Sequence, residues 1–108
     1  MKRGEVWWVE FDPAVGSEIH KTRPGIIISN DAANRNLARV VVVPLTSSVD
    51  RQYPGEALVT VDGKQAKAMA DQIMAADKSR LKSQLGVVSK ADMRLMEDAI
   101  RVHLGLRK

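Results

Sequence analysis

Cysteine is absent from this 108-residue sequence, and histidine occurs only twice, as His20 and His103. The absence of cysteine excludes disulfides, thiolate nucleophiles and cysteine-based zinc sites. Two histidines are too few to favour a histidine-based metal cluster. We therefore expect a protein that needs no cofactor and a chemistry that does not use a metal ion.

Long hydrophobic runs are also lacking. The apolar stretch near the start, within MKRGEVWWVEF, is short and is interrupted by Glu10. It is too short for the core of a signal peptide or for a membrane span. The default expectation is a cytoplasmic protein that does not contact a membrane.

The composition is that of an ordinary globular protein, with 44% hydrophobic and 28% charged residues. A chain of this length falls in the size range of one domain, so residues 1–108 are predicted to form a single domain. The formal net charge of +4 favours a polyanionic partner, such as nucleic acid or an acidic protein tail.

Short strands account for most of the expected secondary structure. The runs 25–29 (GIIIS) and 40–46 (VVVVPLT) are continuously apolar, which is typical of strands covered on both faces. Other strands are predicted at 5–11, 57–61, 67–75 and 84–88. Between 30 and 39, Asn30 or Asp31 can cap a short helical turn, and 79–81 suits a single turn.

The last part of the chain has helical periodicity. Ser89 is a credible N-cap, apolar residues recur at helical spacing from Met93 to Leu104, and Gly105 supplies a stop. The sequence thus predicts a mainly β protein with some α (α+β). Its five or six short strands should form a strongly bent antiparallel sheet or barrel, closed by a C-terminal helix.

Arg23 and Thr46 are the leading candidates for a functional pair. Pro24 forces Arg23 into an extended conformation, so Arg23 enters its strand already extended. If the two apolar strands pair antiparallel with Ser29 opposite Val40, Arg23 lies directly opposite Thr46. Directly opposed side chains have Cβ atoms about 4.5 to 5.5 Å apart. A planar fork of donors beside a hydroxyl is suited to binding phosphate.

Other polar and aromatic candidates carry weaker signals. Histidine ordinarily titrates near neutral pH, which makes His20 a proton-transfer candidate, although solvated loop histidines are commoner. Glu18, Asp71 and Asp77 could accept a proton, but their spacing singles out none of them. Trp7 and Trp8 alternate across the first strand, so one can pack inward while the other stacks on a base. Core packing or a subunit interface is favoured for both.

The order of motifs along the whole chain resembles the MazF/PemK-like toxin endoribonucleases. The motifs are RGEVWWVEFDPAVGSE, KTRPGIIISND, VVVVPLTSS, DQIMAADKSRL and a closing helix that ends in HLGL. The resemblance implies an SH3-like antiparallel β-barrel with a C-terminal helix, usually a homodimer, that cleaves single-stranded RNA without a metal. It further implies an antitoxin partner whose acidic, flexible segment occupies the RNA groove.

The resemblance also implies roles for particular residues. The catalytic pair falls on Arg23 and Thr46, and the reaction would leave 2′,3′-cyclic phosphate and 5′-OH ends. Because arginine stays protonated in proteins, Arg23 suits an electrophile or general acid, and the base stays open between Glu18, His20 and solvent. The expected substrate-binding residues are Gly16, Ser17, Glu18, His20, Lys21, Ser47, Ser48 and Gln72.

Two other classes of protein remain open on the same fold. One is a non-catalytic barrel that only binds RNA. The other is a protein-binding toxin like the gyrase poisons. The presence of both Arg23 and Thr46 favours the endoribonuclease over either alternative.

Overall fold

A computed structural model describes residues 1–107, so Lys108, the last residue of the predicted domain, lies outside the described part. The strands are β1 (Glu5–Glu10), β2 (Thr22–Ile27), β3 (Arg39–Thr46), β4 (Glu56–Val61), β5 (Lys64–Met69), β6 (Met74–Asp77) and β7 (Leu81–Val87). The helices are α1 (Asp31–Asn36) and α2 (Lys90–Leu104), and the 3₁₀ turns are η1 (Ala70–Gln72) and η2 (Lys78–Arg80).

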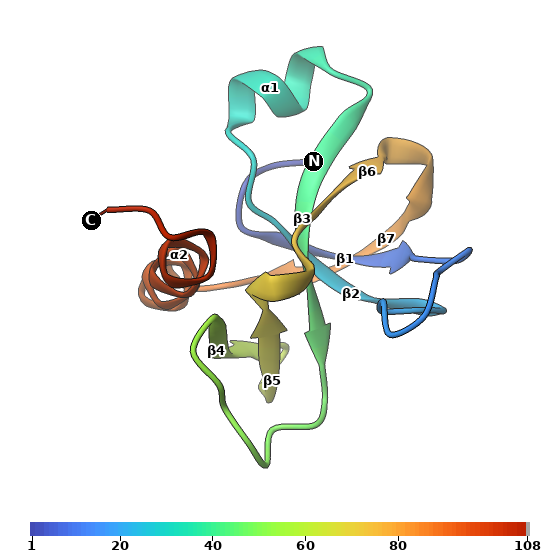
Figure 1. Cartoon of the computed structure of the whole chain (residues 1–108). Coiled ribbons are helices and arrows are strands. Elements are labelled where there is room, and N and C mark those ends of the chain that lie inside the picture. Colours follow the sequence, from blue (N-terminus) through green and yellow to red (C-terminus); the bar gives the residue numbers. More distant parts are fainter. Residues whose placement is uncertain (108) are drawn as a thin grey trace.

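The strands form one antiparallel sheet in the order β4-β5-β3-β2-β1-β7, and β6 pairs with the first half of β3. The long strand β3 is shared: Arg39–Val42 pair with β6, whereas Leu45 and Thr46 pair with β5. Figure 1 shows β3 crossing the molecule from α1 to the β4–β5 hairpin, with α2 to one side. The predicted fold class, a small, curled SH3-like antiparallel barrel with a C-terminal helix, is confirmed.

Two clusters of buried apolar side chains hold the sheet together. The first cluster includes Val6, Ile26, Leu45 and Met96, and it joins the sheet to α2. The second cluster consists of side chains on the opposite face of the same strands, and it includes Val9, which is fully buried. Because alternate residues of β2 and β3 enter different clusters, these strands are covered on both faces, as their continuous apolar runs predict.

Helix α2 begins and ends where the sequence predicts. The Ser89 hydroxyl oxygen accepts a hydrogen bond from the Asp92 N–H at 3.0 Å, which satisfies one of the free donors of the first turn. Gly105 takes the left-handed conformation (φ 68°) that a helix C-cap favours. Met93 and Met96 of α2 are buried and belong to the first core cluster. No helix in residues 1–107 is long and apolar enough to cross a membrane.

The region 67–75, predicted as one strand, is instead two strands separated by a turn. β5 ends at Met69, η1 turns the chain, and β6 begins at Met74. The break is needed because β5 pairs with the far half of β3 and β6 with its near half. The described residues therefore contain seven strands, more than the predicted five or six, and β7 starts at Leu81, three residues before the predicted 84.

Candidate active site at the ends of β2 and β3

Strands β2 and β3 pair in the register that the sequence predicts. Gly25 lies opposite Pro44, Ile26 opposite Val43, and Ile27 opposite Val42. Continued by two residues beyond Gly25, this register sets Arg23 against Thr46. The extension is natural because both residues still belong to their strands, β2 from Thr22 and β3 to Thr46.

A cavity of about 340 Å³ opens where the two strands end, and we call it the Arg23 cavity. From β2 its lining includes Thr22, Arg23 and Pro24. From β3 it includes Leu45 and Thr46, and Ser47 follows directly after that strand. Trp8 of β1, Leu85 of β7 and side chains of the β4–β5 hairpin complete it. Of the predicted site residues, the structure thus brings Arg23, Thr46 and Ser47 together.

The guanidinium of Arg23 has a buried donor, its Nε, without a hydrogen-bond partner among the described residues. Buried donors are nearly always paired, and an unpaired one costs folding free energy. The Arg23 side chain therefore lines a cavity and has a donor that no described residue uses.

Thr46 is arranged to donate its hydroxyl proton. Its Oγ1 accepts a hydrogen bond from the Ser48 N–H at 3.3 Å, which orients the oxygen and leaves its O–H free. Ser48 is less available, because its own hydroxyl donates to Asp50 Oδ1 at 2.8 Å. That hydrogen bond is the main reason that the pKa of Asp50 lies below its usual range.

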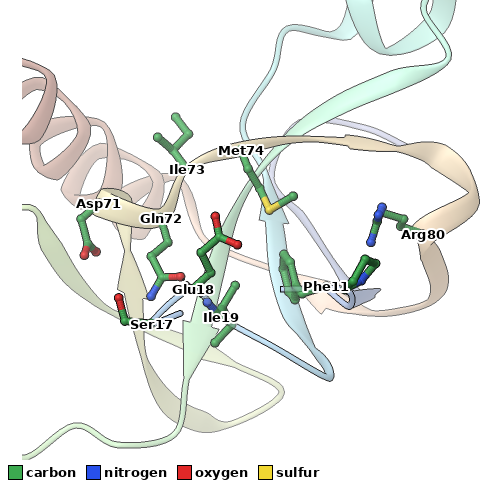
Figure 2. A pocket seen from close by; sticks show the side chains of 10 residues that line it. Phe11, Ser17, Glu18, Ile19, Asp71, Gln72, Ile73, Met74 and Arg80 are labelled. Carbon is green, nitrogen blue, oxygen red and sulfur yellow. Dashed lines mark hydrogen bonds between the residues drawn. The ribbon is translucent and has the colours of Figure 1, made fainter. Parts of the chain in front are cut away.

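A second cavity, of about 640 Å³, holds three other predicted residues, and we call it the Glu18 cavity. Figure 2 shows Ser17, Glu18 and Gln72 gathered at one side, with Phe11 and Arg80 at the other. The Gln72 Oε1 accepts a hydrogen bond from the Ile19 N–H at 2.5 Å. Gln72 therefore holds the β1–β2 loop, and it lies in the turn η1 and not on a strand as predicted.

Glu18 and the rest of the loop show local constraints. The Glu18 Oε1 accepts a hydrogen bond from the Val15 N–H at 2.7 Å. Gly16 has φ 60°, a conformation that glycine adopts without strain. Lys21 also has a positive φ, 65°, and its N–H donates to Asp12 Oδ1 at 3.0 Å. Gly16, His20, Lys21 and Ser48 line neither the Arg23 cavity nor the Glu18 cavity.

Several side chains in these cavities carried no sequence signal of their own. Asp62 and Lys64 line the Arg23 cavity together with Trp8, which the sequence did single out, and Arg80 lines the Glu18 cavity. Asp62 and Lys64 belong to the Asp-Gly turn region between β4 and β5, which the sequence shows only as a turn. Their approach to Arg23 depends on the curl of the sheet, which brings residues of the β4–β5 hairpin to the same cavity as residues of β1 and β2.

A buried ion pair supports the strand end that carries Thr46. Lys67 lies opposite Thr46 in the β3–β5 pairing and is 9% exposed. Its Nζ lies 3.5 Å from Glu56 Oε2 and donates to the Arg51 carbonyl at 2.9 Å. The Glu56 Oε1 accepts from the Tyr53 N–H at 2.7 Å. This network ties the loop that follows Thr46 to the sheet.

Residues 1–107 contain no group of three or more histidine, cysteine, aspartate or glutamate side chains placed to hold a metal ion. The polar groups of the Arg23 cavity include a guanidinium, an ammonium and hydroxyls, together with the Asp62 carboxylate and the Gln65 amide. The guanidinium, the ammonium and the hydroxyls can bind and polarise an anionic ester, which is the chemistry of phosphate recognition and charge stabilisation.

Comparisons with known proteins agree with this fold. Residues 2–104 match the family described as PemK-like, MazF-like toxin of type II toxin-antitoxin system. The endoribonuclease MazF9 of Mycobacterium tuberculosis is 40% identical, with 98% of both chains covered. The endoribonuclease MazF of Staphylococcus saprophyticus is 32% identical, with 98% of this chain and 92% of the relative covered.

Among solved structures, a mycobacterial endoribonuclease in complex with its cognate antitoxin is similar, with a TM-score of 0.84 and 29% identity. The match covers all of this chain and 98% of that one. The fold and these likenesses define a small toxin of the barrel type. The chain belongs to the PemK-like, MazF-like family of type II toxin-antitoxin systems, and it is an endoribonuclease toxin.

Proposed function

We propose that this toxin cleaves single-stranded RNA, mRNA above all and also rRNA or tRNA, at preferred sequences and without a metal ion. In the reaction, a ribose 2′-oxygen attacks the adjacent phosphorus and the bond from phosphorus to the 5′-oxygen breaks. The 2′-OH proton goes to a base, and a proton is delivered to the leaving 5′-oxygen. The products are a 2′,3′-cyclic phosphate end and a 5′-OH end.

The observation that carries this proposal is that Arg23, whose buried Nε is unpaired among the described residues, lines the same cavity as Thr46. The pentacovalent transition state concentrates negative charge on the phosphoryl oxygens, and preorganised donors stabilise such charge strongly. Arg23 serves as electrophile and candidate general acid, because a guanidinium stays protonated. Thr46 serves as a second donor, since its oxygen is already oriented by Ser48.

Three side chains compete for the role of base. Glu18 and His20 were the sequence candidates, but neither lines the Arg23 cavity, whereas Asp62 does. The pH dependence of kcat/KM separates them, because removing the true base removes the acidic limb of the profile. Glu18→Gln, His20→Ala and Asp62→Asn would be compared on one RNA. A profile unchanged in all three variants assigns the step to solvent.

The substrate contacts are proposed to come from both cavities. Ser47 lies beside Thr46 in the Arg23 cavity, and Ser17, Glu18 and Gln72 line the Glu18 cavity. The remaining loop positions, Gly16, His20, Lys21 and Ser48, would border the RNA between or beside these cavities. The toxin is further proposed to act in the cytoplasm as a homodimer, with an antitoxin whose acidic segment competes with RNA for this basic protein.

The test uses purified protein, a defined single-stranded RNA and excess chelator. We expect cleavage to continue, with cyclic phosphate ends, and a single 2′-deoxy substitution to block it. Arg23→Ala and Thr46→Ala should abolish cleavage, while the matched surface variants Arg94→Ala and Thr60→Ala keep it. Chelator-sensitive cleavage, or products without cyclic ends, would contradict the mechanism. RNA binding without cleavage would favour the non-catalytic barrel. The absence of both RNA binding and cleavage would favour a protein-binding toxin.

A further inference from the structure

The two neighbouring tryptophans of β1 have different environments. Trp7 is half-buried, packs against the second core cluster, and donates its indole N–H to Glu5 Oε1 at 2.9 Å. Trp8 is 37% exposed and lines the Arg23 cavity. Leaving part of a large aromatic surface in contact with water gives up burial that would stabilise the fold. The exposed indole is therefore a feature that the core does not explain.

The position of Trp8 is fixed by the sheet. Its cross-strand partner on β2 is Pro24, and Val6 and Ile26 form the next pair on the same face, two residues further into the first core cluster. The pairing of β1 with β7 shifts register on each side of the two tryptophans. Such bulges re-aim side chains at functional edges of sheets. The backbone thus holds the indole in place at the end of the core.

The Arg23 cavity combines two kinds of surface. Leu45 and Val61 belong to the first core cluster, and Ala66 and Leu85 pack against it, so they provide an apolar floor. Arg23, Thr46 and Lys64 provide donors at the same cavity. Its volume of about 340 Å³ falls in the range of about 300 to 1,000 Å³ typical of small-ligand sites. A flat apolar group joined to an anion matches this combination.

We propose that Trp8 is the stacking platform for the nucleobase next to the scissile phosphate. The base lies on the indole and the apolar floor while its phosphate reaches Arg23 and Thr46. Stacking on aromatic side chains tolerates every base and contributes substantially to single-strand binding. This inference rests on the proposed function. An apolar protein side chain would cover the floor but leave Arg23, Thr46 and Lys64 without an acceptor.

Fluorescence tests the stacking directly, because the chain has only two tryptophans. Trp7→Phe leaves Trp8 as the single emitter, and Trp8→Phe leaves Trp7. A non-cleavable oligonucleotide with 2′-deoxyribose at the cleavage site should quench the Trp7→Phe protein and leave the Trp8→Phe protein nearly unchanged. Inorganic polyphosphate, a polyanion without bases, should quench neither. Equal quenching of both proteins, or quenching by polyphosphate, would overturn the proposal.

Cleavage kinetics give a second, independent measurement. An abasic nucleotide beside the scissile phosphate should lower kcat/KM of the wild type about tenfold, as expected for one stacked base. The abasic nucleotide should lower kcat/KM of the Trp8→Leu variant by no more than about twofold, because this variant lacks the indole on which the base would stack. Equal losses of kcat/KM in both proteins would refute the role of Trp8 without contradicting the proposed function. If the wild type cleaves no RNA, the proposed function fails, and the quenching result still decides the stacking.

Discussion

Replacing Arg23 with methionine should stabilise the folded protein while it removes RNA cleavage. The Nε of Arg23 is buried without a partner. A buried unsatisfied donor costs about 1 to 3 kcal/mol of stability, and methionine fills a similar space without a polar atom. Because Arg23 is only half-buried, we take the lower end and expect the free energy of unfolding to rise by about 1 kcal/mol. That corresponds to a rise in Tm of about 4 °C for a domain of this size.

Urea unfolding followed by tryptophan fluorescence measures this change, with Arg94→Met as the control. Arg94 lies exposed on α2, so its replacement removes the same charge from a protein of net charge +4 without touching the site. We expect the control to change stability by less than about 0.5 kcal/mol. A loss of stability in Arg23→Met, or an equal gain in Arg94→Met, would refute the reasoning that Arg23 is held unpaired for a ligand.

Phosphate supplies the complementary half of this experiment. If the unpaired donor accepts an anion, inorganic phosphate binds only the folded protein and stabilises it by about 1.4 kcal/mol at ten times its dissociation constant. The Arg23→Met variant should lose this stabilisation and Arg94→Met should keep it. Equal stabilisation of all three proteins would show that phosphate acts on the solvent or elsewhere on the surface.

Three further predictions follow from single contacts. Lys67→Met should cost about 3 kcal/mol in urea unfolding, because it removes the cation that pairs with the largely buried Glu56 carboxylate. Lys82→Met breaks a pair that is about half exposed and should cost less than about 1 kcal/mol. Hydrogen bonds from the Ser79 hydroxyl and N–H hold the pKa of Asp77 below its ordinary 3.8, so that its stabilising effect is complete above that value and is lost as the pH falls through the lowered pKa. Asp77→Asn should therefore flatten the acid loss of stability measured between about pH 5 and pH 2. Gln72→Leu should speed hydrogen exchange of the Ile19 amide about fivefold by removing its acceptor, and unchanged exchange would contradict the loop-holding role.

Local patterns predicted the parts of the fold that local physics controls. The Ser89 cap, the Gly105 stop and the Asn30-capped turn α1 are all where the sequence predicts them. The pairing of β2 with β3 was a hypothesis based on two apolar runs joined by a connection of about ten residues; the observed register agrees with it and gives Arg23 and Thr46 a common strand end. These features need only neighbouring residues or one hairpin, so the sequence contains the information that specifies them.

A strongly bent sheet was predicted, but the strand partners that bend it were beyond such reasoning. Nothing local shows that β3 pairs with β5 over one half and β6 over the other, so the break at η1 was missed. The same long-range geometry brings Trp8 and Lys64 to Arg23, although they are far apart in the sequence. It also separates Glu18 and Gln72 from Arg23, which divides the predicted site between two cavities.

The β1–β2 loop is the physical connection between these two cavities. It begins at Phe11 in the Glu18 cavity and leads into Thr22 and Arg23 in the other. The Arg80 Nη1 holds its start by donating to the Glu10 carbonyl at 2.9 Å and the Asp12 carbonyl at 2.8 Å. A ligand that displaces the loop in one cavity must therefore pull on the strand that positions Arg23 in the other. Binding in the Glu18 cavity and charge stabilisation at Arg23 are consequently expected to be coupled, by antitoxin as well as by RNA.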